Sequence, residues 1–298
     1  MTIVGTGALA TLFAARLGAS GPVTVLGSWA EALVGFRERG ALLETDEGML
    51  RARVAATSDP SDCRGARVAL VLVKSCETAR AAAMIRSFLA PDGVAATLQN
   101  GLGNVETLAG TLGPERVVAG SAEVGATLTS PGRARHAGGN KIRLAAHSRA
   151  GEVARVFSEG GFEVETGGTA AGILWEKLGA AAPLLPLTAL LGVTNGEVFS
   201  RPSAAALLEA AAREIVETAA AEGIALDAAD PAGASRRVAR ATSANESSML
   251  QDVRRGAATE VDAINGAVVE AARRHGIAAP VNETLWLAVR ALGERGAP

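Results

Sequence analysis

The chain has 298 residues, and its 29 Lys plus Arg against 31 Asp plus Glu give a formal net charge of −2. This length suits two domains, and the 48% of hydrophobic residues can fill real cores, which excludes a wholly disordered protein. No basic block stands out, so we expect binding to neither nucleic acid nor an anionic membrane. Two cysteines and three histidines argue against a disulfide framework and a metal site. We expect a cytoplasmic protein.

One stretch, residues 178–196, is uncharged over 19 residues and has the length of a membrane-spanning helix. Gly179, Pro183, Pro186 and Gly192 interrupt it, and charged residues 176–177 precede it directly. We interpret this stretch as a buried helix pair.

The first half of the chain alternates short apolar strands with helical segments. Ile3 and Val4 form a very short first strand, and residues 7–18 follow as a helix with one apolar face made of Leu9, Leu12, Phe13 and Leu17. Further strands are expected at 23–26, 68–73, 94–98 and 117–120. This rhythm predicts an α/β Rossmann-type domain with a parallel, doubly wound sheet, spanning residues 1–168.

The alternation stops near residues 166–169, and helix formers dominate from there on. Alanine-rich helices are expected at 204–222 and 260–274, with Gly223 and Gly276 at the positions of helix C-caps. The sequence therefore predicts an all-helical second domain at 169–298.

A glycine-rich turn follows the first strand and opens the first helix. Its residues are Gly5, Thr6, Gly7, Ala8, Leu9 and Ala10, a G-x-G-x-x-A sequence. In such turns the first glycine permits the tight bend, the second lets the backbone approach a pyrophosphate, and the third small residue allows close packing of helix on strand. The motif predicts a dinucleotide site, and the alternative is a plain glycine turn.

The end of the second expected strand bears on the choice of dinucleotide. NAD-specific folds usually carry Asp or Glu there, but residues 26–29 are Leu-Gly-Ser-Trp and contain no carboxylate. We therefore expect NADP (NADPH), with Ser28 donating a hydrogen bond to the 2′-phosphate. The alternative for Ser28 is an ordinary N-cap of the next helix.

These motifs, in this order and spacing, resemble the ketopantoate reductase (2-dehydropantoate 2-reductase) family over nearly the whole chain. The resembling segments are 5–10, 73–74, 99–106 (Gln-Asn-Gly-Leu-Gly-Asn-Val-Glu), 136–139, 174–178 (Leu-Trp-Glu-Lys-Leu), 186–189, 194–197, 247–252 (Ser-Ser-Met-Leu-Gln-Asp) and 259–266 (Thr-Glu-Val-Asp-Ala-Ile-Asn-Gly).

The resemblance implies an NADPH-dependent reductase of a small-molecule 2-oxo acid, with Lys177 as the catalytic lysine and Glu260 as its acidic partner. It implies ligand contacts for four further residues: Asn100 near both nicotinamide and substrate, Asn195 and Ser248 at the substrate, and Lys74 along the cofactor cleft.

Elementary chemistry supports the two catalytic roles. Hydride addition to a ketone leaves negative charge on oxygen, and a lysine ammonium supplies both a positive partner and a proton. Thr259 and Asp262 resemble a capping box, which would place Glu260 in the first turn of a helix. The alternatives are a snorkelling lysine and a glutamate that only stabilises a helix.

The sequence departs from the family where Ala181 and Leu185 stand in place of two asparagines. Helical spacing puts them on the face of Lys177, so this substrate-lining face becomes apolar, and Pro183 predicts a kink between them. The substrate is then ketopantoate or a more apolar 2-oxo acid. The alternatives are a non-catalytic NADP-binding regulatory protein and a related 3-hydroxyacid dehydrogenase. A homodimer is compatible with the sequence, which does not determine the oligomeric state.

Overall fold

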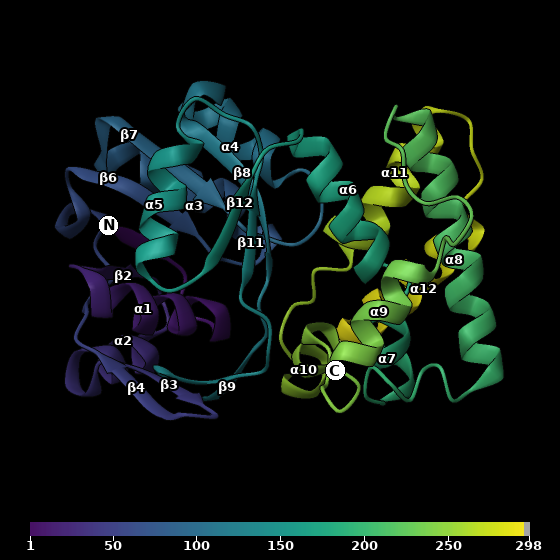
Figure 1. Ribbon diagram of the computed structural model, residues 1–298, viewed down its shortest axis with the longest axis horizontal. Helices are drawn as coiled ribbons and strands as arrows, with labels where there is room; N and C mark the ends of the chain where they lie inside the picture. The colour runs from purple at the N-terminus through teal and green to yellow at the C-terminus, as the bar shows by residue number, and fades with distance from the viewer. Residues whose placement is uncertain (295–298) are drawn as a thin grey trace. The chain divides into compact units, whose positions relative to one another are not determined.

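The computed structural model describes residues 1–294, which form two compact units (Figure 1). The first unit contains Met1–Gln99 and Asn104–Ile173, and the second contains Asn100–Gly103 together with the chain from Leu174 onward. The second unit thus includes a short segment, Asn100–Gly103, from the first half of the chain.

The first unit is built on an eight-stranded sheet. Its spatial order is β12-β11-β8-β7-β6-β1-β2-β5, and all neighbouring pairs are parallel except β11 with β8. The strands are β1 (Thr2–Val4), β2 (Thr24–Leu26), β5 (Ala55–Thr57), β6 (Ala66–Val71), β7 (Leu89–Thr97), β8 (Val117–Glu123), β11 (Lys141–Leu144) and β12 (Glu163–Thr166). The chain leaves β1 toward β2 and β5, then returns to β6 on the other side. The predicted doubly wound, Rossmann-type sheet is confirmed.

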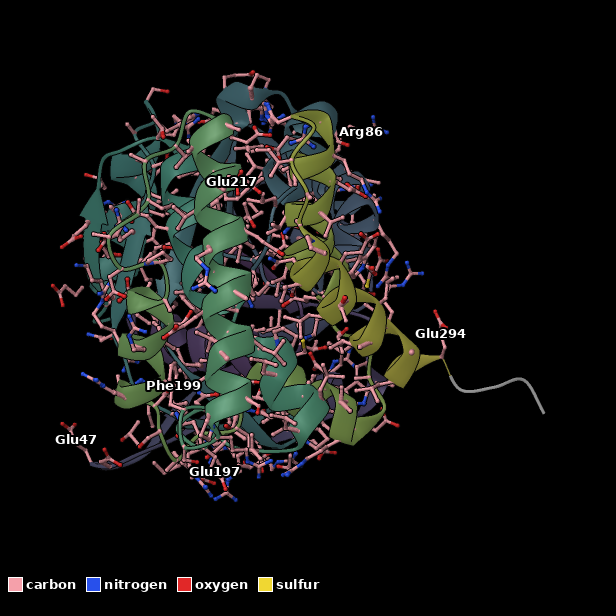
Figure 2. The ribbon with its side chains drawn as sticks, turned by 90° about the vertical axis from the view of Figure 1, so that its right-hand side faces the viewer. Glu47, Arg86, Glu197, Phe199, Glu217 and Glu294 are labelled. Carbon is pink, nitrogen blue, oxygen red and sulfur yellow. The ribbon has the colours of Figure 1, made fainter. Side chains whose placement is uncertain are left out.

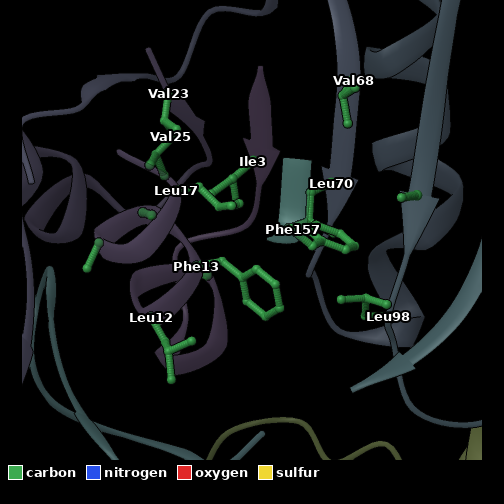
Figure 3. Close-up of a cluster of buried hydrophobic side chains, with 14 of the residues drawn as sticks. Ile3, Leu12, Phe13, Leu17, Val23, Val25, Val68, Leu70, Leu98 and Phe157 are labelled. Atoms are coloured by element: carbon green, nitrogen blue, oxygen red, sulfur yellow. The ribbon is translucent and has the colours of Figure 1, made fainter. Parts of the chain in front are cut away.

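Both faces of this sheet are buried, because alternate strand residues point to opposite sides. Ile3 and Leu70 face α1 (Ala8–Ser20), α2 (Ala30–Arg39) and α5 (Ala150–Glu159). Their immediate neighbours Val4 and Val71 face α3 (Thr78–Phe88) and α4 (Asn104–Leu112) instead. Figure 3 shows the first of these clusters, in which the Phe13 and Phe157 rings meet edge to face, 5.6 Å between centroids.

A second, four-stranded sheet of order β4-β3-β10-β9 packs on α1 and was not predicted. Its strands are β3 (Ala41–Thr45), β4 (Gly48–Ala52), β9 (Ala126–Ser130) and β10 (Arg133–His136). These strands are only partly buried and carry no continuous apolar run, which is why the sequence does not show them. Short 3-10 turns complete the unit: η1 (Pro60–Cys63), η2 (Ser75–Glu77) and η3 (Pro114–Arg116).

From Ala170 to Glu294 the chain has no strand, which confirms the predicted helical domain. The helices are α6 (Ala170–Ala181), α7 (Leu185–Leu191), α8 (Pro202–Ala221), α9 (Gly233–Ala241), α10 (Ser248–Arg255), the π turn η4 (Asp262–Gly266), α11 (Ala267–Arg274) and α12 (Pro280–Gly293). In Figure 2, α8 runs beside the yellow C-terminal helices, with Glu217 on its exposed surface. The predicted cap glycine Gly223 follows α8 with φ +77°, and the next N–H, of Ile224, bonds back to the Ala219 carbonyl at 2.8 Å.

The apolar stretch Ala170–Leu191 is long and apolar enough to cross a membrane, but 61% of its most apolar window is buried inside the protein. It consists of two helices, α6 and α7, joined by a turn at residues 182–184, which confirms the predicted buried helix pair. The expected kink at Pro183 is wrong, because the helix ends there completely. Leu185 opens a new helix and so does not continue the face that Lys177 and Ala181 share on α6.

Candidate functional site: a glycine turn and an asparagine–glutamate contact

The turn after β1 requires glycine at its first position. Gly5 has φ +133°, and a Cβ atom there would lie 2.6 Å from the Leu72 carbonyl oxygen. Its N–H donates to the Leu26 carbonyl at 2.9 Å, which fixes the bend at the ends of β1 and β2. Gly5 thus has the role expected of the first glycine in the fingerprint.

Gly7 differs from Gly5, because a Cβ atom at Gly7 would meet nothing within 4 Å. Gly7 is the N-cap of α1 and makes no side-chain cap, and the first turn of α1 holds no acidic residue. The first N–H groups of a helix have no partner within it, and the helix dipole adds positive potential there. Ala10 is fully buried against the sheet. This open, positive, side-chain-free surface fits a pyrophosphate.

The end of β2 lies close to the same turn. A Cβ atom at Gly27 would lie 2.5 Å from Cγ2 of Thr6, so any larger residue there would displace the Thr6 side chain. Ser28 is exposed, and it does not cap α2, because Trp29 is the N-cap residue and makes no side-chain cap bond. The N-cap alternative for Ser28 is therefore wrong, which leaves its hydroxyl at the carboxyl edge of the sheet.

Lys74 follows β6, the strand beside β1 on the other side of the point where the strand order reverses. Ligands of open α/β sheets bind at the carboxyl ends of strands at this point. The loop that carries Lys74 is held by Gln99, whose Nε2 donates to the Val73 carbonyl at 2.9 Å and to Thr78 Oγ1 at 2.8 Å. Sequence reasoning quoted Gln99 but gave it no role. Its position in an otherwise apolar strand end is the signal for a buried polar anchor.

In the helical unit, the segment Asn100–Gly103 is attached to Glu260 and to the first residues of η4. Asn100 Nδ2 donates to Glu260 Oε2 at 3.1 Å, and the Leu102 N–H donates to the Ala263 carbonyl at 2.9 Å. Gly101 has φ +82°, and a Cβ atom there would lie 2.3 Å from that same carbonyl oxygen. The approach of the two segments therefore requires glycine at position 101, and it brings two of the predicted site residues into direct contact.

Lys177 lies half-buried on α6, between two residues of a buried cluster. Residues within two positions of Glu260 and Asn100 in the sequence belong to the same cluster. Its members include Trp175 and Leu178 from α6, Val261 and Ile264 from the glutamate turn, and the partly buried Leu102. Lys177, Glu260 and Asn100 thus emerge from one core.

The capping box expected at Thr259 and Asp262 is wrong. The Asp262 carboxylate accepts the indole N–H of Trp286 at 2.6 Å and lies 3.7 Å from Arg290 Nε, and η4 has no side-chain cap. Glu260 precedes the π turn, and its carbonyl accepts the N–H of Ile264 at 3.0 Å. The glutamate is therefore held at the entry of a π turn, a structure that is frequent at functional sites.

Asn195 is buried in the turn that follows α7. Its N–H donates to the Asn245 carbonyl at 3.0 Å and its Nδ2 donates to Thr242 Oγ1 at 2.8 Å, while its Oδ1 has no partner. Glu197 closes the turn by accepting the N–H of Thr194 at 2.8 Å, which lowers the pKa of the Glu197 carboxyl. Asn195 thus has a buried amide oxygen without a partner and one amide N–H beyond the bond to Thr242.

Ser248 is the exposed first residue of α10. Its neighbour Ser247 has a structural role, since it accepts the N–H of Leu250 at 3.0 Å and shares a 2.6 Å hydrogen bond with the Thr188 hydroxyl. Ala181 and Leu185, the two predicted apolar substrate contacts, are the half-buried end of α6 and start of α7. Within residues 1–294 no three His, Cys, Asp or Glu side chains form a group suited to a metal ion.

Comparison with known proteins identifies the family to which this fold and these motifs belong. The family model described as "Ketopantoate reductase PanE/ApbA" matches residues 1–149, and its companion "Ketopantoate reductase PanE/ApbA C terminal" matches residues 170–293. The chain belongs to the ketopantoate reductase family. Two curated family members named 2-dehydropantoate 2-reductase are similar over 97% of this chain: one from Halobacterium salinarum, 39% identical over 97% of its own length, and one from Archaeoglobus fulgidus, 34% identical over 96% of its length.

Solved structures agree with this assignment. A PanE/ApbA family ketopantoate reductase from Ralstonia eutropha JMP134 is 30% identical, with a TM-score of 0.90 and 99% of each chain covered. A D-mandelate dehydrogenase solved with NADH and anilino(oxo)acetate has a TM-score of 0.91 at 22% identity, covering 99% of this chain and 98% of its own. This second likeness shows the fold alone. The curated relatives are oxidoreductases by name.

Proposed function

We propose that this protein is an NADPH-dependent reductase that converts a 2-oxo acid to the 2-hydroxy acid, either 2-dehydropantoate or a more apolar analogue. The observation that carries the proposal is the 3.1 Å hydrogen bond from Asn100 to Glu260. Residues close to these two in the sequence pack in the same buried cluster as the sequence neighbours of Lys177. A protein that used this fold only to bind a dinucleotide would need the glycine turn, but it would not need the contact between Asn100 and Glu260.

The cradle of the first unit supports the cofactor. Gly5 and Gly7 would hold the pyrophosphate, and Lys74 offers positive charge at the neighbouring strand end. The exposed Ser28, with no carboxylate in residues 26–29, supports NADPH over NADH. When bound, the nicotinamide supplies the hydride for the carbonyl carbon.

The side chains of the protein would stabilise the charge that develops on the substrate and supply the proton. As negative charge develops on the carbonyl oxygen, the Lys177 ammonium stabilises it and gives it a proton, so the product is a neutral hydroxyl and lysine is left as the amine. Asn100 Nδ2 holds one Glu260 oxygen, which keeps that carboxylate oriented as the partner of the lysine. Lysine then regains its proton from solvent.

The choice of substrate follows from two apolar positions and one amide. Ala181 and Leu185 offer no hydrogen bond to a distal hydroxyl of the substrate, and an aliphatic side chain there would bury surface at roughly 25 cal/mol per Å². Asn195 keeps a single acceptor without a partner. We therefore infer a preference for a 2-oxo acid with an aliphatic side chain.

Initial rates of NADPH oxidation with a panel of 2-oxo acids test this function. Ketopantoate, 2-oxoisovalerate and longer aliphatic analogues should be reduced, with the 2-hydroxy acid formed in equal amount to the NADPH consumed. Binding of NADPH without turnover of any member of the panel would contradict the proposal and favour a non-catalytic regulatory protein.

A further inference from the structure

The C-terminal end of α6 carries an unusual set of carbonyl groups. Helix ends leave carbonyls without intrahelical donors, and Pro183 removes one more N–H directly after the helix. At this end the Ala182 carbonyl accepts a hydrogen bond of 2.9 Å from Nδ2 of Asn265. The donor comes from a distant segment, the π turn η4.

Asn265 is completely buried, and both protons of its amide are used. One goes to the Ala182 carbonyl and the other to Asn282 Oδ1 at 3.1 Å, while its own Oδ1 has no partner. A buried acceptor without a partner destabilises the fold, so an apolar residue of similar size would serve packing better. What the amide adds at this position is its pair of donated bonds.

The amide is firmly anchored on its other side. Asn282 Nδ2 donates to Glu214 Oε2 at 2.7 Å and to the Ala211 carbonyl at 3.0 Å. Glu214 also accepts the N–H of Asn282 at 2.9 Å, which fixes the start of α12 on α8. Asn265 therefore joins the end of α6 to a rigid frame made by two other helices.

We propose that Asn265 is a positioning residue that sets the register between the helix of Lys177 and the turn of Glu260. Its bond connects two points at equal chain distance from the reacting groups: Ala182 lies five residues after Lys177, and Asn265 lies five residues after Glu260. Breaking the bond frees the end of α6 to shift relative to η4, and the lysine shifts with it. This inference rests on the proposed function.

Two variants and one control test the positioning role of Asn265. Asn265→Leu keeps the branched side-chain shape and removes the bond, and Asn265→Ala removes both. Leu208→Ala, in a different buried cluster of the same unit, destabilises the protein without touching α6 or η4. Three measurements are made on each protein: thermal unfolding, kcat and KM across pH, and hydrogen–deuterium exchange of a peptide covering 174–182.

Both Asn265 variants should lose kcat by about 10–100-fold, since small misplacements of reacting groups cost rates of this order. The affinity for NADPH should stay within a few-fold, the pH profile of kcat should shift, and residues 174–182 should exchange faster. Leu208→Ala should unfold at lower temperature with kcat per folded molecule, pH profile and exchange of 174–182 unchanged. The positioning role is wrong if the Asn265 variants behave like Leu208→Ala.

The exchange measurement separates this inference from the proposed function. If the wild-type protein reduces no 2-oxo acid, the proposed function fails, and positioning for that reaction fails with it. Faster exchange of 174–182 in both Asn265 variants would then still establish the tie between α6 and η4. Unchanged exchange would overturn the tie itself, whatever the activity.

Discussion

No carboxylate occurs in residues 26–29, where the second strand meets the glycine turn, and the proposed preference for NADPH rests on this segment. Ser28 is exposed and does not cap α2, so nothing in its local structure requires serine. Lys74 is one residue of a loop anchored by Gln99. At the scale of single residues, Gly5 shapes the turn itself, whereas Ser28 is a position at which a substitution should change the choice of ligand and not the turn.

The first prediction concerns Ser28→Asp. A carboxylate at this position would repel the 2′-phosphate of NADPH and accept hydrogen bonds from the ribose hydroxyls of NADH. The ratio of kcat/KM for NADPH over NADH should fall at least about tenfold, because only ~1.4 kcal/mol of repulsion is needed for that factor. Steady-state kinetics with both cofactors measure it, with Ser28→Ala as the matched control. A wild-type protein that already prefers NADH would show that this loop is misinterpreted.

The second prediction concerns the two apolar positions. A substrate hydroxyl that arrives at Ala181 or Leu185 loses water without gaining a partner, at roughly 1–3 kcal/mol, or about 10–100-fold in kcat/KM. The wild-type protein should therefore prefer 2-oxoisovalerate or a longer analogue to ketopantoate, and Ala181→Asn combined with Leu185→Asn should reverse that order.

The single variants separate the two positions, since one ends α6 and the other begins α7. If Leu185→Asn has no effect while Ala181→Asn does, only the position on the lysine helix lines the substrate. A wild-type preference for ketopantoate would remove both positions from the account of specificity.

At the scale of elements, the end of α6 shows how the sequence compensates for a proline. Pro183 has no N–H to give to the Gly179 carbonyl, and Ser235 of α9 supplies its hydroxyl instead, 2.9 Å from the Ala180 carbonyl and 3.3 Å from that of Gly179. Ser235 itself is completely buried, whereas Gly179 and Ala180 are half-buried.

The third prediction follows from this arrangement. Ser235→Ala should lower the free energy of unfolding by about 0.5–1.5 kcal/mol, the net contribution of a typical intramolecular hydrogen bond. In a Pro183→Ala background the restored N–H can serve the Gly179 carbonyl, and the same substitution should cost less. Urea unfolding of the four proteins in this cycle measures the difference, with the exposed Ser203→Ala as a control. Equal costs in both backgrounds would mean that Ser235 does not compensate for the proline.

The elements that were predicted from the sequence share one property, which is a strong local signal. The strands β1, β6 and β7 contain the apolar runs 3–4, 68–71 and 94–96, and the glycine turn combines tight geometry with a helix start. The capping box failed because Trp286 competes for the Asp262 carboxylate from 24 residues away, a contact that local pattern does not contain. The π turn that sets Glu260 and Asn265 was missed for the same reason.

At the scale of the molecule, the parallel sheet and the helical second half were predictable from periodicity, and the four-stranded sheet was not. Its parallel pairing of β3 with β10 joins Leu42 to Arg133, a contact with no sequence signal on either strand. The site residues came from the resemblance to the family, whereas their supports, among them Gln99, Ser235 and Asn265, are buried polar residues to which the resemblance assigned no role. Only the packed structure shows what they hold.

The most direct test of the account is Lys177→Ala, measured for turnover and for cofactor binding on the same preparation. The lysine belongs to the helical unit and the glycine turn to the other, so its removal should affect chemistry and spare the cradle. We expect kcat for the best 2-oxo acid to fall at least ~10²-fold, the scale of a general acid, with the dissociation constant of NADPH within a few-fold of the wild-type value. Near-normal turnover in Lys177→Ala would contradict the central claim that this lysine protonates the product oxygen.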